Sequence, residues 1–157
     1  MNIRIVRGSA TAPTEMASYD AALAEANVHN YNLSYVSSVI PADASVAFVD
    51  SAPDLGPTGN GLTVVEARAT SDEKPVSAAL AWAESDEGPG LFYEAAGEES
   101  PAESRRRAET GLRAGLELRE WSAPGHEVVT ASAEPEGEGE YATALVLAVY
   151  GQSRPLR

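Results

Sequence analysis

The chain has 157 residues, no cysteine and a formal net charge of −13, because 24 acidic residues face only 11 lysine and arginine residues. This composition excludes disulfides, thiolate metal sites and cysteine nucleophiles, and an acidic surface repels the phosphates of nucleic acids. The length fits one domain. No apolar run approaches the roughly 20 residues of a membrane span, and no signal peptide is recognisable at Met1, so we expect a soluble, cytoplasmic protein.

The acidity has two interpretations that are compatible with each other. An anionic protein attracts a cationic ligand by long-range steering. Alternatively, the chain is adapted to a high-salt cytoplasm, where salt screens the repulsion between its own charges. Lys74 is the only lysine, and all other basic residues are arginines. Scarce lysine together with dispersed aspartate and glutamate favours adaptation to high salt, as in a halophilic organism.

The first elements follow from turn signals and hydrophobic spacing. Residues 3–6 predict a strand that ends at Gly8 and Ser9. Residues 14–26 predict a helix, because Thr14 is a suitable N-cap and apolar residues then recur at helical spacing. The next two segments, 31–36 and 44–49, alternate like strands, and a loop rich in proline and glycine covers 50–61.

The second half predicts further strands and one long helix. The helix covers 101–119, with Ala108 and Leu112 in its apolar stripe. The expected strands are 62–69, 76–84, 90–96, 127–133 and 141–150, the last two joined by the acidic loop 134–140. Two helices among seven or eight strands predict an α+β fold, a layered αββα sandwich with the helices packed on mostly antiparallel sheets.

Common catalytic motifs are missing from the sequence. There is no phosphate-binding glycine loop, and His29 and His126 lack metal-ligand spacing, so we interpret both as ordinary surface or turn residues. The unusual segment is 32–41, which reads NLSYVSSVIP. Taken alone, Ser37-Ser38 in this segment has the simple interpretation of a turn after a strand.

Segment 32–41 resembles the self-cleavage site of the pyruvoyl-dependent arginine decarboxylase family, which reads asparagine, leucine, three residues, Ser-Ser, two apolar residues and proline. Other segments of the chain resemble the same family. They are the substrate-binding helix (17–23), the strand with the catalytic glutamate (90–94), and the long helix with its following tryptophan (109–113 and 119–121). These matches are in family order and extend over residues from about 5 to 150.

The resemblance implies self-cleavage between Ser37 and Ser38 into a β chain, 1–37, and an α chain, 38–157. The hydroxyl of Ser38 can attack the carbonyl of Ser37 through a five-membered ring and convert the amide into an ester. Elimination and hydrolysis then leave a pyruvoyl group on residue 38. Because the attack distorts a planar peptide, we expect backbone strain or an oxyanion donor nearby, and the resemblance assigns the amide of Asn32 to that role.

The same resemblance implies the reaction and its parts. The covalent pyruvoyl group from Ser38 accepts electrons when CO2 leaves L-arginine, without metal or pyridoxal phosphate, and agmatine for polyamine synthesis is the product. Glu94 is the candidate acid that protonates the resulting carbon, in an apolar setting, and Asp20 pairs with the guanidinium of the substrate. Tyr93 departs from the family, which has an aliphatic residue there. Relatives form trimers or dimers of trimers, with active sites between protomers.

Two other functions stay open on the sequence. One is a pyruvoyl decarboxylase for another amino acid, such as histidine or aspartate, although Asp20 would repel an acidic substrate. The other is an uncleaved, non-catalytic assembly subunit. Singly, Asp20 and Glu94 also fit ordinary surface acids, and the family order of all the matches favours the enzyme. The run 105–107 of three arginines is interpreted as a solvated helix face that pairs with Glu103 and Glu109.

Overall fold

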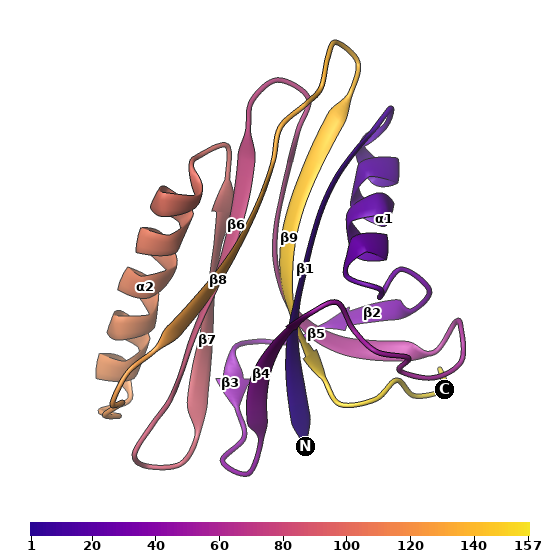
Figure 1. The fold of residues 1–157 in the computed structure, drawn as a ribbon. Helices are drawn as coiled ribbons and strands as arrows, with labels where there is room; N and C mark the ends of the chain where they lie inside the picture. Colours follow the sequence, from indigo (N-terminus) through magenta and orange to yellow (C-terminus); the bar gives the residue numbers. More distant parts are fainter.

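Two stacked β-sheets form the centre of the structure, and one helix covers the outer face of each sheet (Figure 1). The computed structural model describes residues 1–157. The elements are β1 (Asn2–Ala12), α1 (Glu15–Glu25), β2 (Asn32–Tyr35), β3 (Val39–Ile40), β4 (Ser45–Asp50), β5 (Gly61–Ser71), β6 (Val76–Glu84), β7 (Gly90–Gly97), α2 (Pro101–Leu118), β8 (Glu127–Ala133) and β9 (Tyr141–Tyr150). The predicted α+β sandwich is therefore confirmed.

The larger sheet has the strand order β2-β5-β9-β1-β4, and the smaller sheet has the order β3-β7-β6-β8. Strand β1 pairs in parallel with β4, and β2 pairs in parallel with β5, whereas all other neighbours are antiparallel. The consecutive strands β2 and β3 thus belong to different sheets. The chain crosses between the sheets within the segment that resembles a self-cleavage site.

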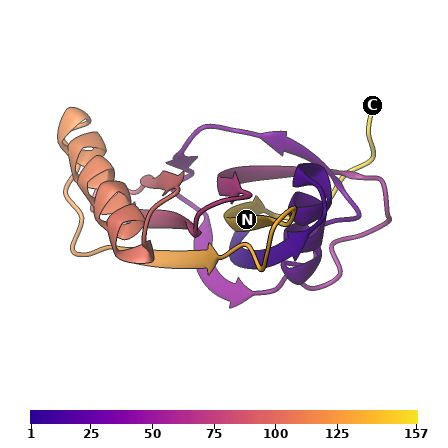
Figure 2. The ribbon, with the colours of Figure 1, turned by 90° about the horizontal axis from the view of Figure 1, so that it is seen from above.

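Three apolar layers hold the sandwich together. The continuous apolar run of β9 serves two of them, because neighbouring side chains on a strand point to opposite faces. Val146 faces the smaller sheet, whereas Leu145 and Leu147 face α1. The third layer joins the smaller sheet to α2 through residues such as Ala81 and Leu112. Viewed from above, α1 and α2 lie at opposite ends of this stack (Figure 2).

Both helices begin at the caps that their sequences provide. The hydroxyl of Thr14 accepts a hydrogen bond from the amide of Ala17 at 3.0 Å, and Ser100 caps α2 through the amide of Glu103 at 3.2 Å. Such caps satisfy amides that lack a partner within the helix. Neither helix is long and apolar enough to cross a membrane.

The prediction that the first strand ends at Gly8 is wrong. The strand continues to Ala12, and α1 packs across it. A β-carbon at Gly8 would lie only 1.9 Å from the carbonyl oxygen of Ala22 in α1. Gly8 therefore permits the close approach of the helix and does not break the strand.

The other strand boundaries differ little from those predicted. Three strands, 76–84, 127–133 and 141–150, match their predicted ranges, and the others move by one or two residues. The exception is β3, which was not predicted. It has only two residues and pairs Val39 with Leu91 of β7. A strand this short carries no periodic signal, and it depends on the neighbouring β7 for its definition.

Candidate functional site

The predicted cleavage site lies where the chain passes from the larger sheet to the smaller one (Figure 2). On the upstream side, the amide of Val36 donates a hydrogen bond to the carbonyl of Val64 on β5 at 3.0 Å. On the downstream side, the amide of Phe92 on β7 donates to the carbonyl of Ser38 at 2.7 Å. The peptide bond between Ser37 and Ser38 is therefore held by one sheet on each side.

The two serines differ in their surroundings. Ser37 is exposed and Ser38 is half-buried, and neither hydroxyl makes a hydrogen bond within the chain. A hydroxyl without a partner can turn toward the preceding carbonyl. The expected local strain does not take the form of a left-handed backbone at either serine. No group of the chain donates a hydrogen bond to the carbonyl of Ser37.

The residues after the cleavage site are fixed by β7 and β9. Val39 pairs with Leu91, and its carbonyl accepts a hydrogen bond from the hydroxyl of Tyr150 at 3.0 Å. The ring of Tyr150 packs edge-on against Phe92, with 6.2 Å between the ring centres. Burial raises the pKa of Tyr150 to about 12, so its hydroxyl stays protonated and able to donate near neutral pH.

Glu94 lies on the same strand and the same face as Phe92, because side chains two residues apart in a strand point the same way. Two steps of strand separate the Cα atoms of these residues by roughly 7 Å. Strand β3 pairs only with Gly90 and Leu91, so it leaves the stretch of β7 around Glu94 open on that edge. Glu94 is exposed in the single chain, which therefore does not provide the apolar setting expected for it.

The residues before the cleavage site are fixed by a cluster on the α1 side of the larger sheet. The hydroxyl of Tyr19 on α1 donates to Glu66 Oε2 on β5 at 2.8 Å and lies 2.9 Å from the hydroxyl of Tyr35 on β2. The guanidinium of Arg68 lies 4.1 Å from the ring centre of Tyr19, and its Nε lies 3.6 Å from Glu66 Oε1. Three elements therefore meet just upstream of Ser37.

Burial has the largest effect on the pKa values of Glu66 and Tyr19 in this cluster. The side chain of Glu66 is only 8% exposed, and burial raises its pKa, while the hydrogen bond from Tyr19 and the charge of Arg68 act in the opposite direction. Burial, followed by the hydrogen bonds to Tyr35 and Glu66, raises the pKa of Tyr19 well above its ordinary value. Tyr19 is therefore a neutral hydrogen-bond donor near neutral pH.

Asp20 and Asn32 lie together in an open pocket of about 520 Å³ beside this cluster. Asp20 comes from α1 and Asn32 from β2, and the tyrosines 19, 31 and 35 line the same pocket. A carboxylate surrounded by aromatic rings suits a guanidinium or ammonium group, since both ion pairing and contact with ring faces favour a cation. Neither serine of the predicted cleavage site lines this pocket, and Glu94 does not line it either.

The side-chain amide of Asn32 is already engaged within the chain. Its Nδ2 donates to the carbonyl of Gly59 at 2.8 Å, and its backbone amide donates to Asn60 at 2.8 Å. Strand β2 runs from Asn32 to Tyr35, three steps of roughly 3.3 Å each, so the amide begins about 10 Å before the end of the strand. Asn32 therefore fixes the loop before β5, and its role as oxyanion donor stays a prediction.

The predicted site residues thus form two groups in the single chain. Ser38 and Glu94 are connected through β7, whereas Asp20 and Asn32 share the pocket on the outer side of the larger sheet. Tyr35 belongs to this pocket and precedes the cleavage site by two residues. The roles predicted for Asp20 and for residue 38 are therefore not combined in one pocket of one chain.

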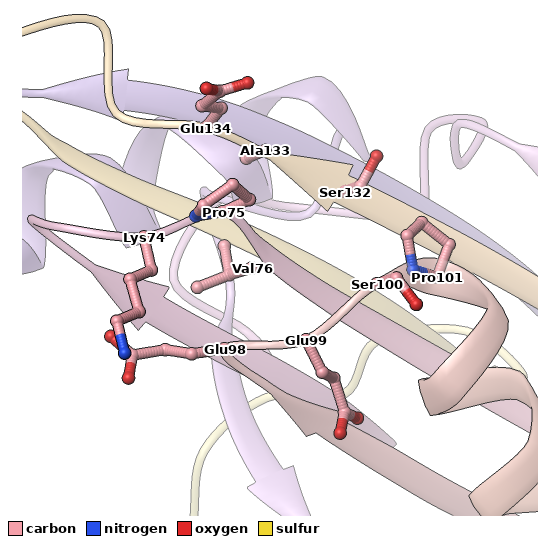
Figure 3. Close-up of a pocket in the computed structure, with 10 residues that line it drawn as sticks. All are labelled: Lys74, Pro75, Val76, Glu98, Glu99, Ser100, Pro101, Ser132, Ala133 and Glu134. Atoms are coloured by element: carbon pink, nitrogen blue, oxygen red, sulfur yellow. The ribbon is translucent and has the colours of Figure 1, made fainter.

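A second pocket, of about 650 Å³, lies at the far end of the smaller sheet (Figure 3). It is formed where β7 ends and α2 begins, and Lys74, Glu98, Glu99 and Glu134 provide its charges. Glu99 pairs with Arg107 of α2. None of the predicted site residues lines this pocket, and its volume alone does not indicate a ligand or a reaction.

The remaining polar motifs lie in ion pairs or at the surface. Arg105 pairs with Glu109 at 3.7 Å, as expected for the arginine run, whereas Arg107 pairs with Glu99 and the expected ion pair with Glu103 does not form. His126 lies 2.6 Å from Glu109, and this contact is the main cause of a lowered pKa of Glu109. His29 is an exposed residue at the rim of the Asp20 pocket. No group of three or more histidine, aspartate or glutamate side chains is placed to hold a metal ion.

The sequence analysis did not single out the residues that make hydrogen bonds on either side of the predicted cleavage site, namely Tyr35, Tyr19, Glu66 and Tyr150. One signal pointed to them: Glu66 interrupts a strand whose other central residues are apolar. A carboxylate in a buried strand requires partners. The sequence does not reveal that one of these partners is Tyr19 from α1, because that contact depends on how α1 packs on the sheet.

Comparisons with known proteins identify the family of this chain. The family model described as "Pyruvoyl-dependent arginine decarboxylase" matches residues 2–155. A pyruvoyl-dependent arginine decarboxylase of Halobacterium salinarum is 57% identical over 155 residues, which cover 98% of this chain and 96% of the relative. Proteins of the same description from Methanopyrus kandleri and Pyrococcus horikoshii are each 32% identical and cover 93% and 91% of this chain. The chain therefore belongs to the pyruvoyl-dependent arginine decarboxylase family.

Proposed function

We propose that the chain cuts itself between Ser37 and Ser38 and then decarboxylates L-arginine to agmatine and CO2. The cut yields fragments 1–37 and 38–157. The observation that carries the proposal is the position of this peptide bond between the two sheets, with the hydrogen bond from Val36 on one side and the carbonyl of Ser38 bonded on the other. In a chain that belongs to a pyruvoyl-dependent family, a serine pair held in this way is the natural source of the pyruvoyl group.

The cleavage chemistry balances without an outside reagent other than water. The Oγ of Ser38 bonds to the carbonyl carbon of Ser37, and the C–N bond between the residues breaks, which converts the amide into an ester. Loss of the Cα proton of residue 38 and departure of the Ser37 carboxylate then leave dehydroalanine. This group tautomerises, and water releases ammonia and leaves a ketone. Each step uses atoms that the chain or the solvent supplies.

The backbone hydrogen bonds on both sides of the Ser37-Ser38 peptide favour this reaction path. The sheets fix Val36 and the carbonyl of Ser38. Residue 37 and the Ser38 hydroxyl therefore sample only a small range of conformations around the peptide bond between them. Holding reacting groups in place removes much of the entropy cost of the attack. Once the bond breaks, Ser37 stays with the larger sheet and residue 38 with the smaller one, so the two ends need not stay in contact. Re-formation of the peptide bond is then disfavoured.

The second reaction assigns one role to each of the two carboxylates. When present, the pyruvoyl ketone supplies the electron sink for loss of CO2. Asp20 binds the guanidinium of arginine and selects it over shorter or neutral amino acids. Glu94 holds a proton and delivers it to the carbon that has lost CO2. Glu94 is supported in this role by its position on the face of β7 that carries Phe92, whose amide binds Ser38.

We further propose that a neighbouring copy of the chain completes the site, in a homotrimer or a dimer of trimers. Asp20 and Glu94 line no common pocket within one chain, and Glu94 is exposed on an open strand edge. Val36 and Val39, which flank the cleavage site, are 42% and 45% exposed. A second protomer packed against these residues would bury them and would enclose Glu94 in an apolar surface.

Release of CO2 from labelled L-arginine tests this function. Purified protein is expected to release CO2 after dialysis against a chelator, and phenylhydrazine, which reacts with ketones, is expected to abolish the activity. The matched control is Ser38→Ala, which keeps the fold and lacks the hydroxyl that forms the ketone. Activity that persists in Ser38→Ala, or that requires added pyridoxal phosphate, would overturn the proposal. Release from histidine or aspartate, but not from arginine, would overturn the substrate assignment alone.

A further inference from the structure

We propose that Tyr35, Tyr19 and Glu66 form an upstream anchor that positions Ser37 for self-cleavage. This inference rests on the proposed cleavage between Ser37 and Ser38, and it goes beyond that proposal by assigning a role to three residues outside the reacting pair. The anchor comprises the hydroxyl of Tyr35, the hydroxyl of Tyr19 and the carboxylate of Glu66, which are connected in this order. These residues are positioning residues, since none of them touches the bond that breaks.

The hydrogen bonds of the anchor have a defined direction. A tyrosine hydroxyl has one proton, and Tyr19 donates that proton to Glu66 at 2.8 Å. The contact of 2.9 Å between the two hydroxyls therefore requires Tyr35 to donate to the oxygen of Tyr19. Because a buried carboxylate accepts strongly, it polarises Tyr19 and strengthens the bond from Tyr35. The chain of bonds thus runs from the exposed β2 to the buried face of β5.

Strand β2 needs such support. It has four residues, lies at the edge of the larger sheet and pairs only with β5. Short edge strands are held weakly by their backbone bonds alone. After the amide of Val36 bonds to Val64, no further bond of the upstream side reaches Ser37. The hydroxyl of Tyr35 makes the last side-chain hydrogen bond before the cleavage site, although 56% of the residue is exposed.

The burial of Glu66 is explained by its own contacts and not by the pocket that contains Asp20. Its carboxylate does not line the pocket that contains Asp20. Its polar partners are Tyr19 and Arg68, and the neighbouring residues on that face, such as Val64, belong to the apolar layer beneath α1. A carboxylate in this position costs free energy of desolvation that an apolar residue would avoid. Within the anchor, its role is to accept the bond from Tyr19.

The anchor connects the two fragments that the cut would produce. Tyr19 and Tyr35 lie in 1–37, whereas Glu66 lies in 38–157. Residue 38, which would carry the ketone, is held separately by Phe92 and β3. Loss of the anchor should therefore slow the cut, because Ser37 becomes more mobile, and should leave the position of the reacting ketone unchanged.

The test follows the conversion of newly made chains into fragments by pulse-labelling and denaturing electrophoresis. The variants are Tyr35→Phe, Glu66→Ala and Glu66→Gln, compared with wild type and with Tyr141→Phe. Tyr141 is a suitable control, because its hydroxyl makes no hydrogen bond within the chain and it lies at the opposite end of β9 from Tyr150. The glutamine variant is the conservative one, since its side-chain oxygen can still accept from Tyr19.

The expected result separates positioning from general stability. Tyr35→Phe and Glu66→Ala should cut roughly fivefold or more slowly, the factor that corresponds to the loss of one neutral hydrogen bond. Glu66→Gln and Tyr141→Phe should cut at nearly the wild-type rate. The kcat of fully cut Glu66→Ala, measured per pyruvoyl group, should equal that of wild type. A wild-type rate of cutting in Tyr35→Phe overturns the anchor while the cleavage itself stands. A wild-type chain that stays intact overturns both.

Hydrogen exchange provides the second measurement, in a Ser38→Ala background where every chain stays whole. Tyr35→Phe should speed exchange of the Val36 amide without lowering the melting temperature, because the hydroxyl that it removes is at the surface. Equal exchange with and without the Tyr35 hydroxyl overturns the anchor. If Glu66→Ala lowers the melting temperature, the comparison of Tyr35→Phe with Tyr141→Phe still decides the proposal.

Discussion

The amide of Phe92 donates a hydrogen bond to the carbonyl of Ser38 at 2.7 Å. In the proposed cleavage, that carbonyl survives the cut and becomes the amide carbonyl next to the new ketone. The same bond therefore acts twice, first on the uncut peptide and then on the group that reacts with arginine. The contacts of Tyr150 with Phe92 and with the carbonyl of Val39 support it in both states. Contacts downstream of Ser38 should therefore affect both the cutting and the later decarboxylation, whereas contacts upstream of Ser37 should affect the cutting alone.

The Tyr150→Phe variant tests this difference. Removal of the hydroxyl leaves the ring against Phe92 and frees the carbonyl of Val39, so residue 38 is held less firmly. We expect both the rate of cutting and the kcat of the cut protein to fall by roughly fivefold, the equivalent of one hydrogen bond. Pulse-labelling measures the first and CO2 release per pyruvoyl group the second. An unchanged kcat would show that Tyr150 does not position the reacting group.

The Glu94→Gln variant tests the proton donor. A glutamine cannot deliver a proton, so kcat should drop by about 10²–10⁴-fold, the usual contribution of general acid catalysis. Cutting between Ser37 and Ser38 should continue, at least in part, because Glu94 has no role in the ester step. Each preparation is checked for its fragments before CO2 release is measured against arginine concentration. Normal cutting with a wild-type kcat would remove Glu94 from the mechanism.

The Asp20→Asn variant tests recognition. Loss of the charge opposite the guanidinium should cost on the order of 2–4 kcal/mol, as for other truncated ion pairs, and should appear mainly in kcat/KM for arginine. Asp72→Asn, which removes the same charge from an exposed residue outside the pocket, is the matched control and should retain the wild-type kcat/KM. A wild-type kcat/KM in Asp20→Asn would place the guanidinium elsewhere.

The strand that carries Glu94 is also fixed by a close contact with α2. A β-carbon at Gly115 would lie 2.5 Å from Tyr93 Cε1, and one at Gly111 would lie 2.7 Å from Tyr93 Cδ2. Gly115→Ala should therefore lower the free energy of unfolding by about 1–3 kcal/mol through overpacking, although alanine is the better helix former. The contrasting variant is Gly125→Ala, in open space, which should be neutral. Full stability in Gly115→Ala would mean that Tyr93 moves aside freely.

The dependence on salt tests the meaning of the charge. A chain with a net charge of −13 repels itself at low ionic strength, and salt at molar concentration shortens the reach of that repulsion to about 3 Å. We therefore expect the melting temperature to climb steeply between low salt and molar KCl. The abundance of acidic residues would instead serve ligand steering alone if the melting temperature were equal at both concentrations.

Much of the fold follows from local patterns in the sequence. The segments 127–133 and 141–150 are recognised from neighbouring residues alone, and the structure places those strands at the predicted bounds. Gly8 shows where local patterns fail. A glycine in a strand either ends it or admits another backbone, and the choice here depends on α1, which packs against it. The two-residue β3 was missed because only its partner β7 defines it.

Less of the candidate site could be predicted from physical patterns. Asp20, Glu94 and Asn32 were chosen through the family resemblance, because no spacing in the sequence distinguishes them from the other polar residues. The anchor of Tyr35, Tyr19 and Glu66 could not be predicted, since its members come from β2, α1 and β5 and meet only in the folded chain. The geometry adds that Asn32 is engaged with Gly59, which the resemblance did not indicate.

The mass of the purified protein tests the central claim most directly. Intact mass spectrometry of wild type is expected to detect two fragments, 1–37 and 38–157. The larger fragment should be lighter, by the replacement of its terminal serine with a pyruvoyl group, than the corresponding serine-ended peptide. Ser38→Ala should give one mass for the whole chain. A single full-length mass for a wild-type protein that releases CO2 from arginine would contradict the proposed self-cleavage, because activity would then exist without the cut.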